Sequence, residues 1–349
     1  MLVPDFWFAI PGDIKTLTGG YIYAQRLMEL LPTTGWHPRL LSLPGTFPTP
    51  SENDLSDTRK AFENLPENST VLVDGLAFGV MPQKTLDGLN LNLVALVHHP
   101  LALETGLSKS ETDRLRASEK TVLTNAQTVV TTGPDTARTL IDQYNVPETK
   151  IFVALPGTDP AERTLGSDGE PQLLTVATLT HRKGYDVLVR ALASVSDLPW
   201  KSVCVGSLKR EPETTALILN LIESYKLEER IELRGEIPGD KLNSVYMQSD
   251  IFVLPSRHEG YGMAFAEALA RGLPIVACDA GAVADTVPRQ AGQLVPPDDP
   301  GALSAALRKL LTDPAARSSA ADGAWAHGQK LPRWEDTSKI VAEALKAAS

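Results

Sequence analysis

Short apolar runs alternate along this chain with segments in which apolar residues recur every three or four positions. A short run between turn residues is typical of a parallel strand buried on both faces, and the wider spacing is typical of a helix. Strands are predicted at 6–10, 40–43, 71–73, 93–97, 129–132, 151–153, 173–179, 203–205, 231–237 and 251–254. Helices are predicted at 21–31, 185–192, 263–270, 302–311 and 335–348. This alternation predicts an α/β fold with parallel, doubly wound sheets, whose ligands bind beyond the carboxyl ends of the strands.

The chain has room for two hydrophobic cores. Its 349 residues are 42% hydrophobic, which suffices for two domains. Residues 160–171 are rich in acidic residues, glycine and proline, a composition suited to a linker. We expect the boundary between the domains there.

Charge and cysteine content limit the partners and the compartment. A net charge of -10, with no long run of lysine or arginine, disfavours nucleic acid and anionic membranes as partners. No apolar run reaches the roughly 18 residues that span a bilayer, and no basic segment precedes the short apolar start. Cys204 and Cys278 lie in apolar runs, as buried free thiols do in a reducing cytosol. A cytoplasmic protein is expected, with peripheral contact at the inner face of the membrane left open.

The stretch 256–274 carries the strongest chemical signal. Gly260 and Gly262 allow a tight turn before an apolar helix, whose first amides lack intrahelical partners and form an anion site. Glu267 lies alone among the apolar residues of that helix, where a carboxylate needs partners such as a sugar diol. Glu259, eight residues earlier, can face whatever the turn binds. The alternative is a solvated Glu259 and a purely structural Glu267.

This stretch resembles the glutamate-x7-glutamate motif of retaining glycosyltransferases of family 4, which have the GT-B architecture. The resemblance extends over Pro255-Ser256, Glu259-Gly260-Tyr261-Gly262, Glu267-Ala268-Leu269-Ala270, Gly272 and Pro274-Ile275-Val276-Ala277. One departure follows, because Ala280-Gly281-Ala282 and Asp285 stand where the family usually has two glycines and then a glutamate. The contacts on that side of the donor site are therefore left open.

The resemblance implies a fold and a division of labour. It implies two doubly wound Rossmann-like domains that face a central cleft. Residues 1–160 would form the acceptor-side domain and 161–334 the domain that binds the nucleotide-sugar. Residues 335–349 would form a helix that crosses back to the first domain.

The implied activity is transfer of a sugar from a nucleotide diphosphate donor to a hydroxyl acceptor, with retention at the anomeric carbon. The enzyme would be of the hexosyltransferase type, and the acceptor a glycan, a lipid or a small molecule. Glu259 would hold donor-sugar hydroxyls, Glu267 the ribose diol and His98 the reacting face of the sugar. His99 is the alternative histidine, and Glu104 and Glu119 nearby are interpreted as structural. No aspartate pair follows a strand in the setting of a metal-bridged diphosphate, so no metal ion or cofactor is expected.

Two cations follow the first predicted strand of the second half. Arg182 and Lys183 lie in a strand-to-helix turn, where an arginine fork and a lysine point charge can clamp a diphosphate. A solvated turn is the alternative. Similarity to an Arg-Lys-Gly region of the family makes these two residues, with His98 and Glu259, the predicted catalytic set. The predicted donor-binding residues are Gly19, Gly20, Gly206, Arg234, Ile237, Gly260, Tyr261, Gly262, Met263 and Glu267.

Two other classes of protein remain as alternatives. A sugar-nucleotide epimerase of the same architecture would release free nucleotide, and the glutamate motif argues against it. A non-catalytic GT-B partner subunit would have lost key groups, yet the principal groups are present. A dehydrogenase is disfavoured because no Gly-x-Gly-x-x-Gly follows the first strand. The sugar, the nucleobase, the acceptor, the linkage and the oligomeric state are not determined by the sequence.

Overall fold

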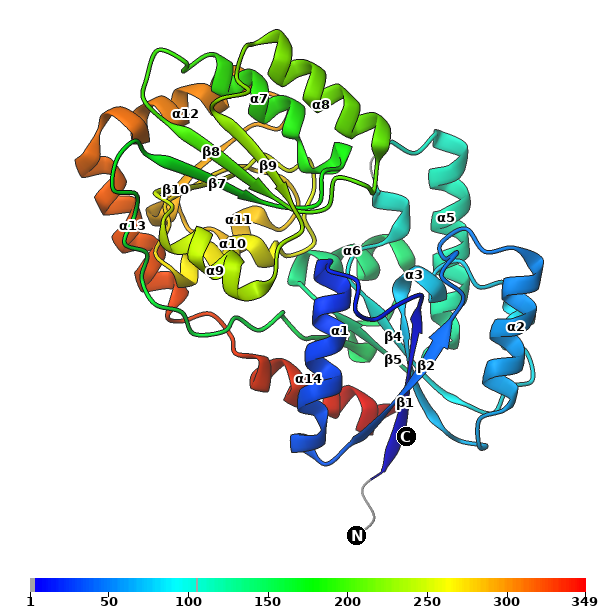
Figure 1. Cartoon of the computed structure of the whole chain (residues 1–349). Coiled ribbons are helices and arrows are strands. Elements are labelled where there is room, and N and C mark those ends of the chain that lie inside the picture. The colour runs from blue at the N-terminus through cyan, green and yellow to red at the C-terminus, as the bar shows by residue number, and fades with distance from the viewer. Residues whose placement is uncertain (1–3, 105) are drawn as a thin grey trace. The chain divides into compact units, whose positions relative to one another are not determined.

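The computed structural model describes residues 4–104 and 106–349, which form two compact units (Figure 1). The first unit comprises Met1–Gly157 together with Pro332–Ser349, and the second comprises Thr158–Leu331. The last helix, α14 (Trp334–Ala348), therefore belongs to the first unit. The sequence placed the boundaries at 160/161 and 334/335.

In the described part of the first unit, the sheet is parallel and six-stranded, in the order β2-β1-β3-β4-β5-β6. Its strands are β1 (Asp5–Pro11), β2 (His37–Leu43), β3 (Thr70–Asp74), β4 (Asn92–Val97), β5 (Thr128–Thr131) and β6 (Ile151–Val153). Phe8 of β1 lies opposite Leu40 on one side and Leu72 on the other. Every residue of β3 is buried, as a central parallel strand requires.

Helices flank this first sheet. They are α1 (Gly19–Leu30), α2 (Glu52–Glu63), α3 (Gly75–Phe78), α4 (Gln83–Leu86), α5 (Lys109–Val122), α6 (Pro134–Tyr144) and α14, with 3-10 turns η1 (Leu31–Thr34), η2 (Leu101–Leu103), η3 (Leu123–Asn125) and η4 (Glu148–Lys150). Capping boxes fix the starts of two of them, because Ser51 pairs with Asp54 at α2 and Ser108 with Glu111 at α5. Helix α14 packs on α1 and on strands β4 and β5.

In the second unit, the sheet within the described residues is also parallel and six-stranded, in the order β12-β11-β10-β7-β8-β9. Its strands are β7 (Gln172–Val176), β8 (Lys201–Val205), β9 (Ile231–Gly235), β10 (Ile251–Leu254), β11 (Ile275–Cys278) and β12 (Gly292–Val295). Its helices are α7 (Tyr185–Ala193), α8 (Pro212–Ser224), α9 (Gly239–Met247), α10 (Met263–Ala270), α11 (Val283–Thr286), α12 (Pro300–Thr312) and α13 (Pro314–Gly328), with η5 (His181–Lys183) and η6 (Arg289–Ala291).

The strand order of the second sheet determines where its ligand site lies. From the centre of the sheet, strands β7, β8 and β9 follow one another toward one edge. Strands β10, β11 and β12 follow one another toward the opposite edge. The loops after β7 and β10 therefore diverge at a topological switch point, where open α/β sheets bind their ligands. In this unit those loops are residues 177–184 and 255–262.

The segment 160–171 lies against the second unit rather than hanging between domains. The Thr164 hydroxyl contacts the carbonyl oxygens of Tyr246, Met247 and Ser249 at 3.1, 2.9 and 2.9 Å. The Asp250 carboxylate accepts hydrogen bonds from the Ser167 N–H, at 3.4 and 3.3 Å. Thr164, which is not one of the acidic, glycine or proline residues that suggested a linker, thus anchors this segment.

Candidate active site

A buried ion pair occupies the switch point of the second unit. Lys183, from η5 after β7, donates to Oε1 of Glu259, from the loop after β10, at 2.6 Å. The Ser256 hydroxyl donates to the same oxygen at 2.6 Å, and Nη1 of Arg182 lies 3.7 Å from Oε2. Glu259 is 5% exposed, so the solvated alternative for this residue is wrong. Three of the four predicted catalytic residues thus lie together.

The electrostatics of Glu259 follow from these neighbours. Burial alone would raise the pKa of its carboxyl group, but the charges of Lys183 and Arg182 hold that pKa below its ordinary value. The carboxylate is therefore ionised at neutral pH. Two cations and one carboxylate leave this cluster with a net positive charge, which suits a diphosphate.

Two hydrogen bonds join the loop after β7 to the loop after β10, one between backbone groups and one from a side chain to a backbone group. The Arg257 N–H donates to the carbonyl oxygen of Arg182 at 2.7 Å, and Nη1 of Arg182 donates to the carbonyl oxygen of His258 at 2.9 Å. The Arg257 guanidinium also binds both carboxylate oxygens of Asp186 on α7, at 3.0 and 2.9 Å, and Asp298 at 2.7 Å. Arg257 was not predicted, because nothing in its sequence context distinguishes it from a solvated arginine.

Two glycines permit this close approach. Gly184 ends η5 with a φ of 68°, and a Cβ there would clash with the carbonyl oxygen of Pro255. Gly281 has a φ of 60°, and a Cβ there would clash with the carbonyl oxygen of Glu259, to which the Ala282 N–H donates at 2.9 Å. Residues 280–282, which depart from the family pattern, therefore pack against the backbone of Glu259.

The predicted anion turn begins helix α10. Gly262 has a φ of 89°, and a Cβ there would lie 2.5 Å from the ring of Phe265. Met263 and Ala264 precede the first N–H bond of the helix, which Phe265 donates to the Gly262 carbonyl oxygen at 2.9 Å. Gly260 and Tyr261 form the turn itself, and Tyr261 is buried, with its carbonyl oxygen held by the Thr286 hydroxyl at 2.7 Å.

Glu267 has protein partners that the sequence did not reveal. The Tyr246 hydroxyl of α9 donates to Oε2 of Glu267 at 3.0 Å, and the Arg271 guanidinium lies 4.4 Å above the Tyr246 ring. Burial raises the pKa of Glu267, and the charge of Arg271 opposes that rise. Glu267 is the one charged residue of α10, and Tyr246 supplies one of the partners that such a carboxylate needs; its role toward a ribose stays a prediction.

The remaining predicted donor residues of this unit follow strands β8 and β9. Gly206 comes directly after β8, donates its N–H to the Gly235 carbonyl oxygen at 2.9 Å, and has no room for a Cβ beside Ala177. Arg234 pairs with Glu232 at 2.8 Å, and Ile237 is half-buried just beyond β9. All three lie near the carboxyl ends of their strands, at the same edge of the sheet as Lys183.

In the first unit the structure brings the predicted glycine pair to the predicted histidine. Gly19 and Gly20 begin α1, and a Cβ on Gly20 would lie 3.3 Å from Nε2 of His98. The His98 ring packs edge-on against Tyr23, with ring centroids 5.4 Å apart. Its Nε2 lies 3.7 Å from Oδ2 of Asp74, which is beyond hydrogen-bond range.

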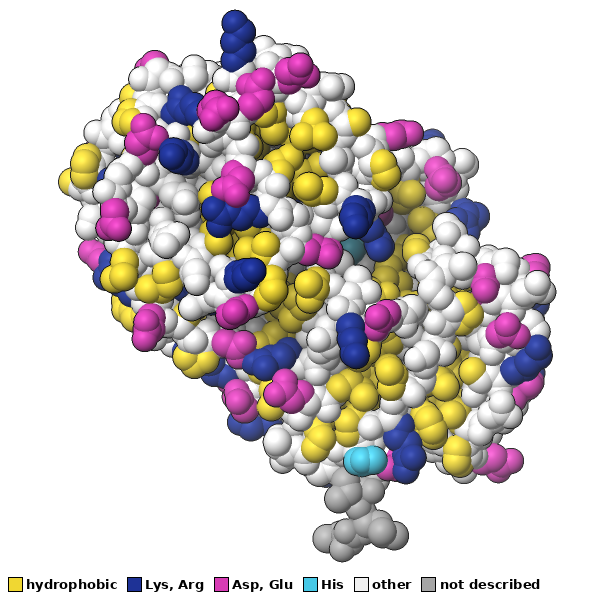
Figure 2. All heavy atoms as spheres, in the orientation of Figure 1, with side chains coloured by type: hydrophobic (Ala, Val, Ile, Leu, Met, Phe, Trp, Pro, Cys, Tyr) yellow, Lys and Arg dark blue, Asp and Glu magenta, His cyan; other side chains and the backbone are white. Residues whose placement is uncertain are grey.

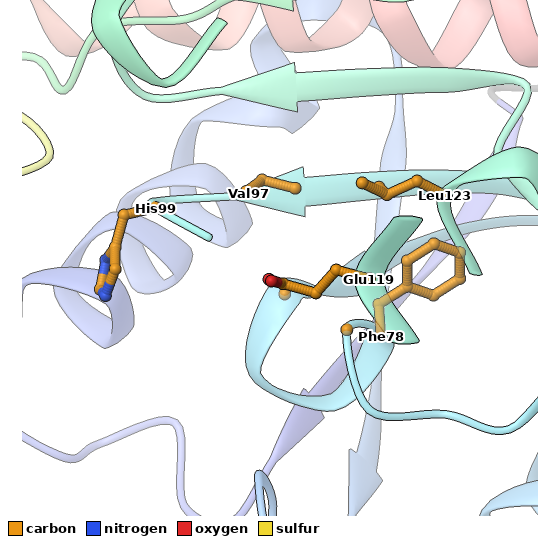
Figure 3. Close-up of a pocket in the computed structure, with 7 residues that line it drawn as sticks. Phe78, Val97, His99, Glu119 and Leu123 are labelled. Atoms are coloured by element: carbon orange, nitrogen blue, oxygen red, sulfur yellow. The ribbon is translucent and has the colours of Figure 1, made fainter. Parts of the chain in front are cut away.

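His99 has different surroundings. Its Nε2 lies 3.3 Å from Oε2 of Glu104. His99 lines a small cavity together with Phe78, Val97 and Glu119 (Figure 3). Of the two histidines, His98 is therefore the one that adjoins the glycine-rich start of α1.

The surface and composition of the described residues add four observations. In residues 4–104 and 106–349 no group of three or more His, Cys, Asp and Glu side chains is arranged to hold a metal ion, and metal independence stays a prediction. None of the helices described has the length and apolar content needed to cross a membrane. Figure 2 shows basic and acidic side chains interspersed over one face. Cys204 and Cys278 are buried free thiols.

Solved structures share this architecture. The chain is similar to sucrose-phosphate synthase from Thermosynechococcus elongatus, with a TM-score of 0.82 and 22% identity over 97% of this chain and 98% of that one. It is also similar to Anabaena HepE in complex with UDP and glucose, with a TM-score of 0.75 and 15% identity over 98% and 99% of the two chains. Two parallel sheets with flanking helices thus define a GT-B fold, as the sequence predicted.

The second unit carries the similarity to a known family. Residues 159–324 match the model of the glycosyl transferases group 1. This part of the chain is similar to that family. D-inositol 3-phosphate glycosyltransferase of Rhodococcus erythropolis is 29% identical over 284 residues, which are 73% of this chain and 63% of that protein. The chain thus spans less than two thirds of the length of this curated relative.

Proposed function

We propose that this chain is a retaining glycosyltransferase that moves a sugar from a nucleotide diphosphate donor to a hydroxyl acceptor. UDP-sugars are the first donors to consider, because the similar Anabaena protein binds UDP and glucose. A polyol phosphate is the first acceptor to consider, because curated relatives are named D-inositol 3-phosphate glycosyltransferases. Retention is proposed from the resemblance of residues 259–267 to the motif of retaining enzymes.

One observation carries this proposal: Lys183 and Arg182 converge on the buried Glu259 at the switch point of the second sheet. A donor contains a diphosphate and a sugar joined by the bond that breaks. Lys183 and Arg182 would bind the diphosphate, and the Glu259 carboxylate would bind the sugar. The contact between these side chains supports the proposal, because the diphosphate and the sugar that they would bind are themselves adjacent in the donor.

The cations would act mainly on the leaving group. Negative charge grows on the nucleotide diphosphate as the anomeric carbon–oxygen bond breaks, and fixed positive charge in a site shielded from water stabilises it. The Met263 and Ala264 amides at the start of α10 add the positive end of a helix dipole. These residues form no covalent bond with the donor. They lower the free-energy barrier to departure of the nucleotide diphosphate.

Donor binding would exchange partners within the cluster. Without donor, Lys183 and Ser256 both bind Oε1 of Glu259. A bound diphosphate competes for Lys183, and the sugar hydroxyls then take its place as hydrogen-bond donors to Glu259. The carboxylate stays satisfied in both states, so the site avoids a buried unpaired charge. For His98 the proposal is contact with the sugar during transfer.

A ligand-binding panel tests this proposal. UDP, GDP and ADP are added separately to the full chain, and the melting temperature is recorded, since a ligand that binds only the folded form raises it. UDP is expected to raise the melting temperature of the wild type and to do so less for Lys183→Ala. Incubation with UDP-glucose then separates the classes: acceptor-dependent UDP release supports a transferase. Free UDP with an altered sugar indicates an epimerase, and binding without turnover for any donor and acceptor indicates a non-catalytic subunit.

A further inference from the structure

Glu119, on α5 of the first unit, is a buried carboxylate that the proposed reaction does not use directly. Its side chain is 5% exposed. It accepts hydrogen bonds from the Leu101 N–H at 2.6 Å, from the Ala102 N–H at 3.3 Å and from the Tyr144 hydroxyl at 3.3 Å. Two of its three donors are thus backbone groups of one short turn, η2.

That turn continues directly from the predicted catalytic histidine. Residues 98–104, named here the His98 loop, run from the end of β4 through Pro100 into η2. At the near end, the carbonyl oxygen of His98 accepts hydrogen bonds from the hydroxyls of Thr132 and Thr136, each at 3.2 Å. At the far end, Glu119 holds η2. The loop is therefore clamped on both sides of His98-His99-Pro100.

The packing around Glu119 leaves it little freedom. Figure 3 shows its side chain extending from α5 into a small cavity beside Phe78 and Val97. The cavity has a volume of about 10 Å³, roughly the room that one water molecule needs. A Cβ on Gly79 would lie 3.0 Å from Cγ of Glu119. Because the side chain is confined, its two bonds to η2 define one position of that turn.

Stability alone does not account for a carboxylate at this place. A buried carboxylate loses hydration, and burial raises the pKa of Glu119 to about 7. An apolar side chain of similar size would avoid that cost. What the carboxylate provides is acceptor capacity for two neighbouring N–H groups at once.

We propose that Glu119 is a positioning residue: by holding the Leu101 and Ala102 N–H groups, it fixes the His98 loop in the conformation that sugar transfer requires. This role rests on the proposed function, because His98 is assigned there to the sugar. Glu119 touches no substrate in this scheme. It acts through the backbone of the loop, and a misplaced His98 slows the reaction.

The charge state of Glu119 makes this role dependent on pH. The titratable and charged groups around it are Arg116 on its own helix, Tyr144 on α6, and His99 with its partner Glu104 beyond β4. When the carboxyl group gains a proton, one oxygen becomes an O–H donor and a weaker acceptor for the N–H groups of η2. The loop is therefore held most firmly above neutral pH.

The test compares the wild type with Glu119→Gln, which keeps the shape but offers one acceptor in place of two. Glu111→Gln, on the exposed start of the same helix, is the matched control for loss of a negative charge. Tyr144→Phe is a second control, because it removes a bond to Glu119 without touching η2. Three quantities are measured in each full-length protein: amide hydrogen exchange at Leu101 and Ala102, kcat and KM with UDP-glucose and acceptor from pH 6 to 8.5, and UDP affinity.

The expected result for Glu119→Gln is faster exchange of both amides, a fall in kcat of about tenfold or more, and unchanged UDP affinity. The wild-type kcat is expected to fall as pH drops through about 7, and this limb is absent in the variant. Both controls are expected to keep wild-type kcat.

Unchanged exchange in Glu119→Gln, or faster exchange with wild-type kcat, overturns the proposal. If Glu119→Gln does not fold, Glu119→Asp, which withdraws the charge by one methylene, takes its place. A wild type that binds UDP but never transfers sugar refutes the proposed function and this role with it, whereas the exchange data alone decide whether Glu119 holds the turn.

Discussion

The ammonium group of Lys183 lies 2.6 Å from Oε1 of Glu259, and both side chains are largely buried. The two residues are 76 positions apart in the sequence and come from the loops after β7 and β10. In the proposed function Lys183 would bind the diphosphate and Glu259 the sugar hydroxyls, and the structure holds these two side chains in contact. Four predictions depend on this cluster and its surroundings.

Lys183→Ala is expected to lower kcat more than it weakens UDP binding. The cation acts most strongly on charge that develops as the nucleotide leaves, so its loss falls mainly on the transition state. Saturating-donor kinetics and calorimetric UDP titration measure the two effects. Equal kcat in variant and wild type at saturating donor would refute the assignment.

Glu259→Gln is expected to destabilise the fold at neutral pH by about 3 kcal/mol, because it leaves Lys183 buried without its anion. The folded-state pKa of Glu259 lies below its ordinary value of 4.5. Its contribution to stability is therefore complete above pH 4.5 and is lost as pH falls through the lower, folded-state pKa. Urea unfolding of both proteins from pH 7 to pH 3 measures this. The stability difference should shrink on acidification, and a constant difference would contradict the ion pair's role.

Much of the fold could be predicted from the hydrophobic pattern. The run at 251–254 corresponds to β10 (Ile251–Leu254), and the run at 6–10 lies within β1 (Asp5–Pro11). Buried parallel strands are continuous apolar runs, which is why they were found. Strand β2 extends to His37, beyond the predicted 40–43, and includes Pro38. A proline is tolerated there because β2 is the edge of its sheet.

Residues of the candidate site could be predicted only where a local sequence motif marks a single side chain. Glu259 and Lys183 were identified from their local motifs, but their contact depends on strand order, which no local pattern contains. Arg257 was missed because its partners, Asp186 and Asp298, are 71 and 41 positions away. The partners of Glu119 could not be predicted, because its main donors are backbone N–H groups, about which residue identity gives no information.

Glu267→Gln is expected to remove most of the preference for UDP over 2'-deoxy-UDP if Glu267 binds the ribose diol. Hydrogen bonds to a charged group contribute roughly 1.5 to 3 kcal/mol, so UDP affinity should fall about tenfold or more. Tyr246→Phe is the control, since it removes the protein partner of Glu267 and keeps the carboxylate. Titration of UDP and 2'-deoxy-UDP into the wild type and the two variants shows whether Glu267 binds the ribose. A preserved ribose preference with a lower melting temperature would assign Glu267 a structural role.

Arg257→Lys is expected to lower both the melting temperature and kcat. A lysine cannot reproduce the forked contact with Asp186 while also binding Asp298, so the two loops that carry Lys183 and Glu259 lose their brace. Arg308→Lys is the matched control, because Arg308 makes a similar forked contact with Asp197 at an exposed position. The control should leave stability nearly unchanged, because an exposed ion pair contributes little, and it should leave kcat unchanged. Equal effects of the two substitutions on kcat would contradict the brace.

The most direct test of the account is the anomeric configuration of the transferred sugar. The full chain is incubated with UDP-glucose labelled with ¹³C at the anomeric carbon, together with D-inositol 3-phosphate and a panel of other hydroxyl acceptors. NMR then follows the labelled carbon, with Lys183→Ala as the control for enzyme-dependent turnover. The account predicts acceptor-dependent loss of UDP-glucose and a new glycoside whose anomeric configuration is α, as in the donor. A β-linked product, or UDP release with no glycoside for any acceptor, would contradict it.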